Sequence, residues 1–217
     1  MDFAEARTAM VDTQVRPNNV TKYSIIAALS KIERENFVPD QMRSVAYADT
    51  PIKIGDNRTL LDARVFSKLL DALNILPSEF VLDIGCGLGY STAVIAELSE
   101  AVVGVETRAD IVTQASENLS TAGIDNAIVV QSALQEGAAK HGPYDVIAIE
   151  GSIEMLPKAL VKQLKDGGRI GAVQYKHGMG VARIGVKAGE TISWREVFHA
   201  DAALLEGFET KQSFTFG

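Results

Sequence analysis

The stretch VLDIGCGLGY, from Val81 to Tyr90, is an apolar run that ends in glycines at alternate positions. The run predicts a buried strand, and the segment STAVIAELS directly after it predicts a helix. A glycine turn between a strand and a helix presents backbone N–H groups and lets a ligand approach the main chain closely. The stretch therefore predicts a ligand site at the carboxyl edge of an α/β sheet.

The alternation of strands and helices continues after this turn. Further apolar runs predict strands at 101–106, 126–131, 144–151 and 167–175, with amphipathic helices between them. Uninterrupted apolar strands of this kind are typical of a parallel sheet that is covered on both faces. The last segments, VARIGVKAG, TISWREVFHA and SFTFG, have strand character without intervening helices. The predicted fold class is a Rossmann-like doubly wound α/β sheet, mostly parallel with an antiparallel C-terminal end.

The N-terminal third of the chain has a different pattern. Helices are predicted from Phe3 to about Arg16, after Thr21 as N-cap, and from Asp62 to Leu73. The segment DTPIKIGDNRTLLD is rich in turn-forming residues and predicts a loop that covers another part of the molecule. We therefore expect residues 1–76 to form a helical cap with a substrate loop. Residues 77–217 are expected to form the ligand-binding core of the same compact unit.

The composition excludes several classes of function. The 217 residues are 47% hydrophobic and 23% charged, which is typical of a globular protein. A net charge of -7 argues against a general nucleic-acid binder. Cys86 is the only cysteine, and the three histidines show no metal-ligand spacing, so we expect neither a disulfide nor a metal site. The N-terminus lacks the pattern of an export signal and no apolar run is long enough to span a membrane, so a cytoplasmic location is expected.

Two acidic residues indicate the kind of ligand that the glycine turn binds. The dinucleotide pattern G-x-G-x-x-G requires a third glycine where this chain has Tyr90, so the turn is a poor cradle for a pyrophosphate. Asp83, two residues before Gly85, would repel a pyrophosphate but suits a ligand that carries an ammonium and a sulfonium. Glu106 ends the next predicted strand, about 20 residues after Gly85, where a carboxylate can accept both ribose hydroxyls.

Together these residues resemble the S-adenosylmethionine site of class I methyltransferases. The resemblance implies S-adenosylmethionine as cofactor, with S-adenosylhomocysteine as product, and assigns cofactor binding to the loop and its neighbours: Asp83, Gly85, Cys86, Gly87, Gly89, Glu106, Ser132 and Ala133. Cys86 is expected to be a small packed residue rather than a nucleophile. Ala133 stands where the acidic residue that contacts the adenine amino group is common, so Ser132 or the backbone would serve instead.

Segments outside the cofactor loop narrow the resemblance. MVDTQV, IERENFVP, AYADTPIKIG and RTLLD precede the glycine strand, and GPYDVIAIEG and LKDGGRIGAV follow it. Their order and spacing resemble the protein-L-isoaspartate O-methyltransferases, from about Met10 to Val173. The resemblance implies methyl esterification of L-isoaspartyl, and also D-aspartyl, carboxyls in damaged proteins or peptides, which starts their repair.

The candidate catalytic residues include departures from that family. Its loop motif is of the type Gln-Thr-Ile-Ser, and the position of the serine hydroxyl is occupied here by Leu61, so Thr59 is the candidate substitute. Asp62 is a candidate for orienting the substrate, although a residue at this place is more often a helix N-cap. Glu150 stands where the family has small neutral residues, at the edge of the sheet that carries the chemistry. Lys53, Arg58 and Arg64 surround the loop as candidate anion-binding groups.

Two alternatives follow from these departures. The first is an O-methyltransferase for a small-molecule hydroxyl, with Glu150 or Asp62 as general base. The second is a non-catalytic relative that binds the cofactor or a damaged peptide without turnover. The pattern is compatible with a monomer or a dimer.

Overall fold

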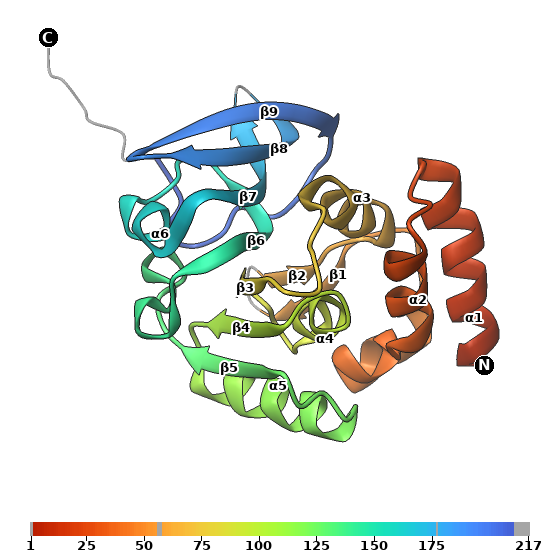
Figure 1. The fold of residues 1–217 in the computed structure, drawn as a ribbon. Helices are drawn as coiled ribbons and strands as arrows, with labels where there is room; N and C mark the ends of the chain where they lie inside the picture. The colour runs from red at the N-terminus through yellow and green to blue at the C-terminus, as the bar shows by residue number, and fades with distance from the viewer. Residues whose placement is uncertain (1, 56–57, 177, 211–217) are drawn as a thin grey trace, which may run out of the picture.

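A seven-stranded sheet lies at the centre of the computed structural model, which describes residues 2–55, 58–176 and 178–210 (Figure 1). The strands lie in the order β5-β4-β3-β6-β7-β8-β9; the first five in this order are parallel, and β8 and β9 are antiparallel. Their bounds are β3 (Phe80–Ile84), β4 (Ala101–Glu106), β5 (Ala127–Gln131), β6 (Tyr144–Ile153), β7 (Leu164–Lys176), β8 (Met179–Ala188) and β9 (Thr191–His199). The predicted fold class is confirmed.

The direction of strand addition reverses beside β3. The chain proceeds from β3 outward to β4 and β5, then crosses back so that β6 pairs with the other side of β3. In open α/β sheets this reversal opens a crevice at the carboxyl ends of the strands, where ligands bind. The glycine turn after β3 lies at this place.

Helices cover both faces of the sheet, as the uninterrupted apolar strands predict. One face carries α3 (Ala63–Leu73), α4 (Tyr90–Ala96) and α5 (Ala109–Thr121). The other carries α6 (Lys158–Gln163) and the short 3-10 turns η5 (Leu134–Glu136) and η6 (Ala139–His141) (Figure 1). The helix predicted between the strands at 144–151 and 167–175 is the short α6, because Leu164 already begins β7.

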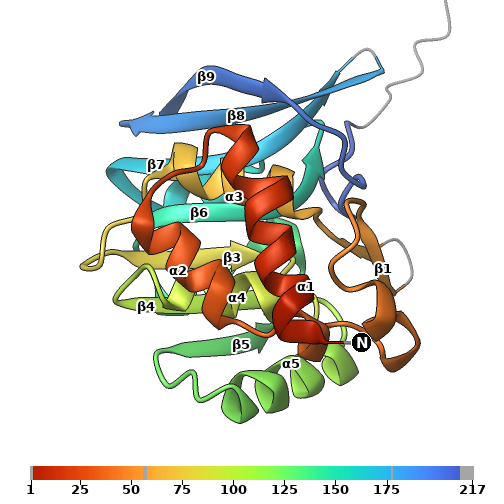
Figure 2. The same cartoon turned by 90° about the vertical axis from the view of Figure 1, so that its right-hand side faces the viewer.

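The N-terminal cap adds a further layer on the first of these faces. In this layer α1 (Phe3–Met10) contacts α2 (Tyr23–Lys31), and α2 contacts both α3 and α4 (Figure 2). The remaining cap elements are η1 (Val11–Val15), η2 (Arg16–Asn18), η3 (Arg34–Phe37) and η4 (Asp40–Val45). One buried hydrophobic cluster includes residues of the cap and of the sheet, so burial of apolar surface stabilises the two together.

The boundaries of the cap helices differ from the predicted ones in detail. The helix expected from Phe3 to Arg16 is helical throughout but changes its winding, as α1 continues into the π-turn η1 and the 3-10 turn η2. The assignment of Thr21 as N-cap of α2 is wrong. Lys22 occupies that position and makes no side-chain capping bond, while its backbone carbonyl accepts from the Ile26 N–H.

The segment expected to be a loop contains a β-hairpin instead. Strands β1 (Ile52–Gly55) and β2 (Arg58–Leu60) pair antiparallel, so the turn-forming residues of this segment join two short strands. Asp62 follows the hairpin, and its carboxylate accepts from the Val65 N–H at 2.8 Å as the N-cap of α3. The hairpin lies beside the sheet at the end where the glycine turn is placed (Figure 2).

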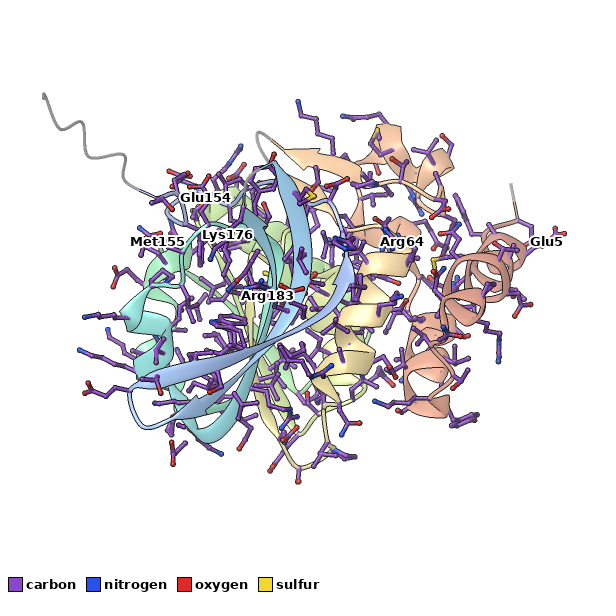
Figure 3. The ribbon with its side chains drawn as sticks, turned by 90° about the horizontal axis from the view of Figure 1, so that it is seen from above. Glu5, Arg64, Glu154, Met155, Lys176 and Arg183 are labelled. Atoms are coloured by element: carbon purple, nitrogen blue, oxygen red, sulfur yellow. The ribbon has the colours of Figure 1, made fainter. Side chains whose placement is uncertain are left out.

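The Arg183 side chain bridges the three strands at the antiparallel end of the sheet. Arg183 of β8 donates to Gln174 of β7 at 3.0 Å and forms an ion pair with Glu196 of β9 (Figure 3). The predicted strands in VARIGVKAG and TISWREVFHA are confirmed, whereas SFTFG lies outside the described residues. Within the described ranges, no helix is long and apolar enough to cross a membrane.

Candidate active site

A cavity of about 310 Å³ lies at the carboxyl edge of the sheet, between the glycine turn and the hairpin. Its walls come from the hairpin, the glycine turn, the end of β4 with the start of α5, and the segment after β9. The lining residues are Ile54, Gly55, Arg58, Gly87, Leu88, Glu106, Thr107, Arg108, Ile111, Leu204, Glu206 and Glu209. Of the predicted cofactor residues, Gly87 and Glu106 line this cavity.

Asp83 is fully buried at the end of β3, beneath the glycine turn. Its Oδ2 accepts from the hydroxyls of Ser91 and Thr92, both at 2.7 Å, while Oδ1 has no hydrogen-bond partner among the described residues. Burial raises the pKa of Asp83 to about 6; the two hydroxyls oppose this shift, and the nearby carboxylate of Glu106 adds to it. A buried carboxylate with one unsatisfied oxygen is poised to accept a further donor or a positive charge.

Glu106 ends β4 and turns its carboxylate back onto the glycine turn. Oε1 accepts from the Gly87 N–H at 2.8 Å, and Oε2 accepts from the Thr107 N–H at 3.0 Å. The Arg58 guanidinium donates to Oε1 through Nε at 3.2 Å and also through Nη2, which completes an ion pair. Glu106 therefore joins the turn to the hairpin in this structure.

Positive φ angles at Gly85 and Gly87, +81° and +55°, require glycine in the turn. A Cβ at Gly85 would lie 2.7 Å from Nη2 of Arg58, and one at Gly87 would lie 2.2 Å from Cδ1 of Ile54. The hairpin side chains thus fill the spaces that these two glycines leave open.

Gly89 and Cys86 serve packing rather than lining the cavity. Gly89 is the N-cap of α4, and a Cβ there would lie 3.4 Å from the Ala115 carbonyl of α5. Cys86 is buried with its sulfur against Gly104, and burial raises the pKa of its thiol well above the usual range. The expectation that Cys86 is a packed residue and not a nucleophile agrees with this placement.

Glu150 lies on β6, next to the strand that carries Asp83, and does not line the cavity. Its side chain is buried, and within the part of the chain that the structure describes Oε1 has no hydrogen-bond partner. Burial, reinforced by the neighbouring Asp83, raises the pKa of Glu150 well above its usual range, against the opposing charges of Arg58 and Arg34. The residue is accordingly a buried acid beneath the site.

The predicted catalytic residues of the hairpin lie in different environments. Thr59 is half-buried on β2, beside Arg58. The Leu61 side chain is only 1% exposed and belongs to the hydrophobic core, so it does not present a group to the cavity. The Asp62 carboxylate is used as the α3 N-cap. Arg64 follows on the first turn of α3 (Figure 3), and Lys53 is exposed on β1.

Ser132 and Ala133 lie outside the cavity that contains Glu106. The Ser132 N–H donates to the Glu106 carbonyl at 3.0 Å, which places this segment at the same edge of the sheet. The Ser132 side chain lines a separate hollow, and Ala133 is exposed as the N-cap of η5. The structure therefore brings them near Glu106 through the backbone alone.

Sequence reasoning missed the partners that hold these groups. The Ser91 and Thr92 hydroxyls fix Asp83, and their position in the first turn after Gly89 was the available signal. Arg34 is buried and donates to the carbonyls of Ala46 and Leu61 at 2.8 and 2.7 Å, which fixes the base of the hairpin. Nothing in the local pattern distinguishes such a buried arginine from a solvent-exposed one.

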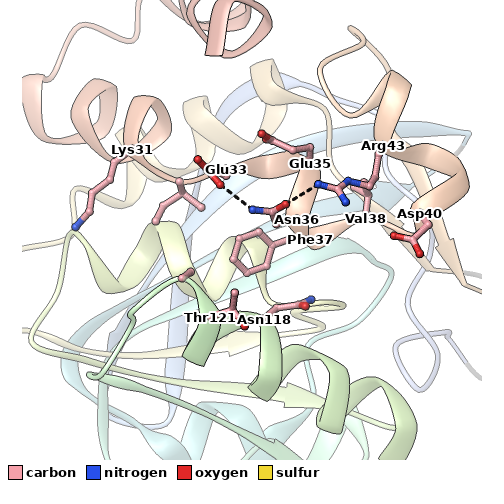
Figure 4. Close-up of a pocket in the computed structure, with 12 residues that line it drawn as sticks. Lys31, Glu33, Glu35, Asn36, Phe37, Val38, Asp40, Arg43, Asn118 and Thr121 are labelled. Carbon is pink, nitrogen blue, oxygen red and sulfur yellow. Dashed lines mark hydrogen bonds between the residues drawn. The ribbon is translucent and has the colours of Figure 1, made fainter. Parts of the chain in front are cut away.

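A second cavity of about 570 Å³ lies between the cap and α5 (Figure 4). Glu33, Asn36, Arg43 and Asn118 are among its lining residues, and a chain of hydrogen bonds links the first three. It contains none of the predicted site residues. Among the described residues, no group of three or more His, Cys, Asp or Glu side chains is arranged to hold a metal ion.

The site fits a cationic adenosyl ligand in its chemistry. Asp83 offers an unsatisfied oxygen, Glu106 offers a carboxylate at the cavity wall, and Gly85 and Gly87 leave space beside the main chain. The same space is taken here by the side chains of Arg58 and Ile54. A ligand that uses this space must displace these two side chains.

Comparison with known proteins places the chain in a family. A profile of the protein-L-isoaspartate(D-aspartate) O-methyltransferase family matches residues 5–190. The chain belongs to this family. It is 37% identical over 164 residues to the protein-L-isoaspartate O-methyltransferase of Methanoculleus marisnigri, covering 76% of this chain and 74% of that protein. It is 35% identical to the enzyme of Syntrophus aciditrophicus, covering 77% of each chain.

Solved structures of the same family agree in fold. A protein-L-isoaspartate O-methyltransferase structure superposes with a TM-score of 0.81 at 24% identity, covering 93% of this chain and 66% of that chain. A Plasmodium falciparum protein-L-isoaspartate O-methyltransferase, solved in complex with S-adenosyl-L-homocysteine, gives a TM-score of 0.78 at 20% identity, covering 92% and 97%. Membership of the protein-L-isoaspartate O-methyltransferase family confirms the resemblance found in the sequence, and with it the class of S-adenosylmethionine-dependent methyltransferases.

Proposed function

We propose that this chain transfers a methyl group from S-adenosylmethionine to the carboxyl of L-isoaspartyl residues in damaged proteins. Relatives at 32–37% identity over about three quarters of the chain are named protein-L-isoaspartate O-methyltransferases. The observation that carries the proposal is the pair of buried carboxylates, Asp83 and Glu106, on either side of the glycine turn. Such a pair favours a ligand with positive charge and free ribose hydroxyls.

The proposed methyl transfer requires little acid–base catalysis by the chain. When bound, S-adenosylmethionine supplies an electrophilic methyl group on a sulfonium. The acceptor carboxylate, with a reference pKa of about 4, is already ionised at neutral pH, so no general base is needed. The chain contributes by holding both partners in line and by excluding water.

Each element of the site has a part in this arrangement. Asp83 attracts the cationic end of the donor through its free Oδ1, and Glu106 accepts the ribose hydroxyls. The hairpin covers the turn and shields it from solvent. Leu61 points into the core and offers no hydroxyl. Thr59 is the proposed substitute, but it does not line the cavity and would have to turn toward it from the other face of β2.

Glu150 favours a second candidate function, the methylation of a hydroxyl. A hydroxyl acceptor needs a base with a pKa near neutrality, and burial moves the pKa of Glu150 in that direction. Its Oε1 lacks a partner in the described ranges, although the residue lies beneath the cavity and not in its wall.

Methyl transfer to matched peptides separates these functions. The purified chain is incubated with methyl-labelled S-adenosylmethionine and a peptide with one L-isoaspartyl residue, or its aspartyl twin. Base-labile label on the isoaspartyl peptide alone is the expected result, because a methyl ester hydrolyses readily. Base-stable label on an alcohol would favour the second candidate. Cofactor binding without label on any acceptor would indicate a non-catalytic relative and overturn the proposal.

A further inference from the structure

Arg58 is a cation placed inside the acidic part of the donor site. Its guanidinium lies in front of Gly85, in the space that the glycine leaves open, and pairs with Glu106. It also opposes the upward pKa shifts of Asp83 and Glu150. In the absence of a ligand, Arg58 is therefore the counter-ion of this cluster of buried carboxyls.

Arg58 and the ribose of the donor compete for the carboxylate of Glu106. Oε1 of Glu106 already accepts from the Gly87 N–H and from two nitrogens of Arg58. A ribose diol that bonds to this carboxylate must displace the guanidinium, since the guanidinium also occupies the space beside Gly85. The Arg58 side chain is only 16% exposed, so on leaving Glu106 it requires another acceptor or water.

The acceptor site lacks the hydroxyl that the family motif places at position 61. Leu61 is buried in the core, three residues after Arg58 on the same hairpin. A guanidinium forms two parallel hydrogen bonds with a carboxylate, a geometry that a single hydroxyl does not offer. A displaced Arg58 would meet the incoming acceptor at the mouth of the same cavity.

We propose that Arg58 exchanges partners during the reaction: it pairs with Glu106 when the donor is absent and binds the acceptor carboxylate when the donor is present. Arg58 then positions the acceptor in place of the missing serine. The second part of this inference, the binding of the acceptor by Arg58, rests on the proposed function because it assumes a carboxylate acceptor. Binding is then ordered, because the Arg58 guanidinium becomes available to the acceptor only after the donor has bound Glu106.

Binding measurements on Arg58→Gln, Arg58→Lys and Lys162→Gln test the exchange without turnover. Calorimetry measures the affinity for S-adenosylhomocysteine alone, and fluorescence anisotropy measures the affinity for an isoaspartyl peptide with and without S-adenosylhomocysteine. Lys162→Gln is the control, because it removes a positive charge from an exposed position of α6 that does not line the cavity. Thermal melting verifies that each variant is folded, and Arg58→Lys provides a conservative variant should Arg58→Gln fail to fold.

The exchange predicts opposite effects on the two ligands. Arg58→Gln should bind S-adenosylhomocysteine at least about fivefold more tightly than the wild type, because no ion pair has to be broken. S-adenosylhomocysteine should raise the peptide affinity of the wild type and of Lys162→Gln by about fivefold or more, and this coupling should vanish in Arg58→Gln. Arg58→Lys should retain the charge but lose part of the coupling, because an ammonium cannot pair with a carboxylate through a planar fork.

The outcomes distinguish this inference from the proposed function. If Arg58→Gln binds S-adenosylhomocysteine no more tightly than the wild type, the exchange is overturned whatever the acceptor is. If it binds more tightly while the coupling to the peptide is unchanged, the acceptor role of Arg58 is overturned. If neither the wild type nor Arg58→Gln binds the isoaspartyl peptide, but Arg58→Gln binds S-adenosylhomocysteine more tightly, the acceptor named in the proposed function is wrong. The release of Arg58 by the donor then stands.

Discussion

Glu106 lies at the wall of the cavity, and we propose that it binds the ribose of the donor. Its two oxygens accept from the main chain at Gly87 and Thr107, and this fixes the carboxylate at the cavity wall. We expect Glu106→Ala to weaken S-adenosylmethionine binding by about 1–3 kcal/mol, the range for lost hydrogen bonds to a charged group. Calorimetry measures the change. Glu190→Ala, in the exposed turn before β9, is the control, and an equal affinity of the two variants would contradict the ribose role.

We expect the affinity for the donor to depend on pH through Asp83. Burial raises its pKa to about 6, so the group is largely protonated at pH 5 and ionised at pH 7.5. Only the ionised form attracts a positive ligand, so affinity for S-adenosylmethionine should rise about tenfold from pH 5 to pH 7.5 and then level off. Titration calorimetry at both pH values measures this change. Asp83→Asn should show a flatter profile, and a wild-type affinity that is the same at pH 5 and 7.5 would refute the assignment.

Individual residues differ in how well the sequence predicted their place. The loop glycines and Asp83 lie at or just after the end of β3, and Glu106 ends β4, as the apolar runs predict. Their roles in cofactor binding stay predictions. Arg58 was only one of three candidate cations, and its ion pair with Glu106 joins residues 48 positions apart. Local patterns do not specify such contacts, since they depend on how the hairpin packs against the sheet.

At the scale of elements, the hairpin depends on Arg34. This buried side chain donates to the carbonyls of Ala46 and Leu61, and its guanidinium lies 4.7 Å from the centre of the Tyr90 ring. Arg34→Met would leave both carbonyls without their donor, so a loss of about 2–4 kcal/mol in the free energy of unfolding is expected. Urea denaturation measures it, with the exposed Arg195→Met of β9 as control. Equal stabilities of the two variants would contradict the role of Arg34.

The elements of the core were better predicted than those of the cap. Buried parallel strands and amphipathic helices have strong apolar periodicity, and each one predicted from 79 to 199 is present within a few residues of its expected position. The hairpin was expected as a loop because β1 and β2 are short and separated by turn-forming residues. The winding of the first helix changes at Val11, a change that its apolar spacing does not reveal.

At the scale of the whole molecule, cap and core share one hydrophobic cluster on one face of the sheet. The hairpin that follows the cap therefore reaches the carboxyl edge of the core, where Ile54 and Arg58 meet the glycine turn. The reversal of strand order beside β3 places the glycine turn and Glu106 at this same edge. The fold thus brings two distant parts of the chain together around one cavity.

Titration of the purified protein with S-adenosylmethionine and, separately, with NAD⁺ tests the central claim most directly. Two buried carboxylates beside a bare turn should accept a cationic adenosyl donor and reject a pyrophosphate. Calorimetry should show S-adenosylmethionine saturating one site per chain and NAD⁺ giving no saturable heat. Saturable binding of NAD⁺, or no binding of S-adenosylmethionine by the folded protein, would contradict the account.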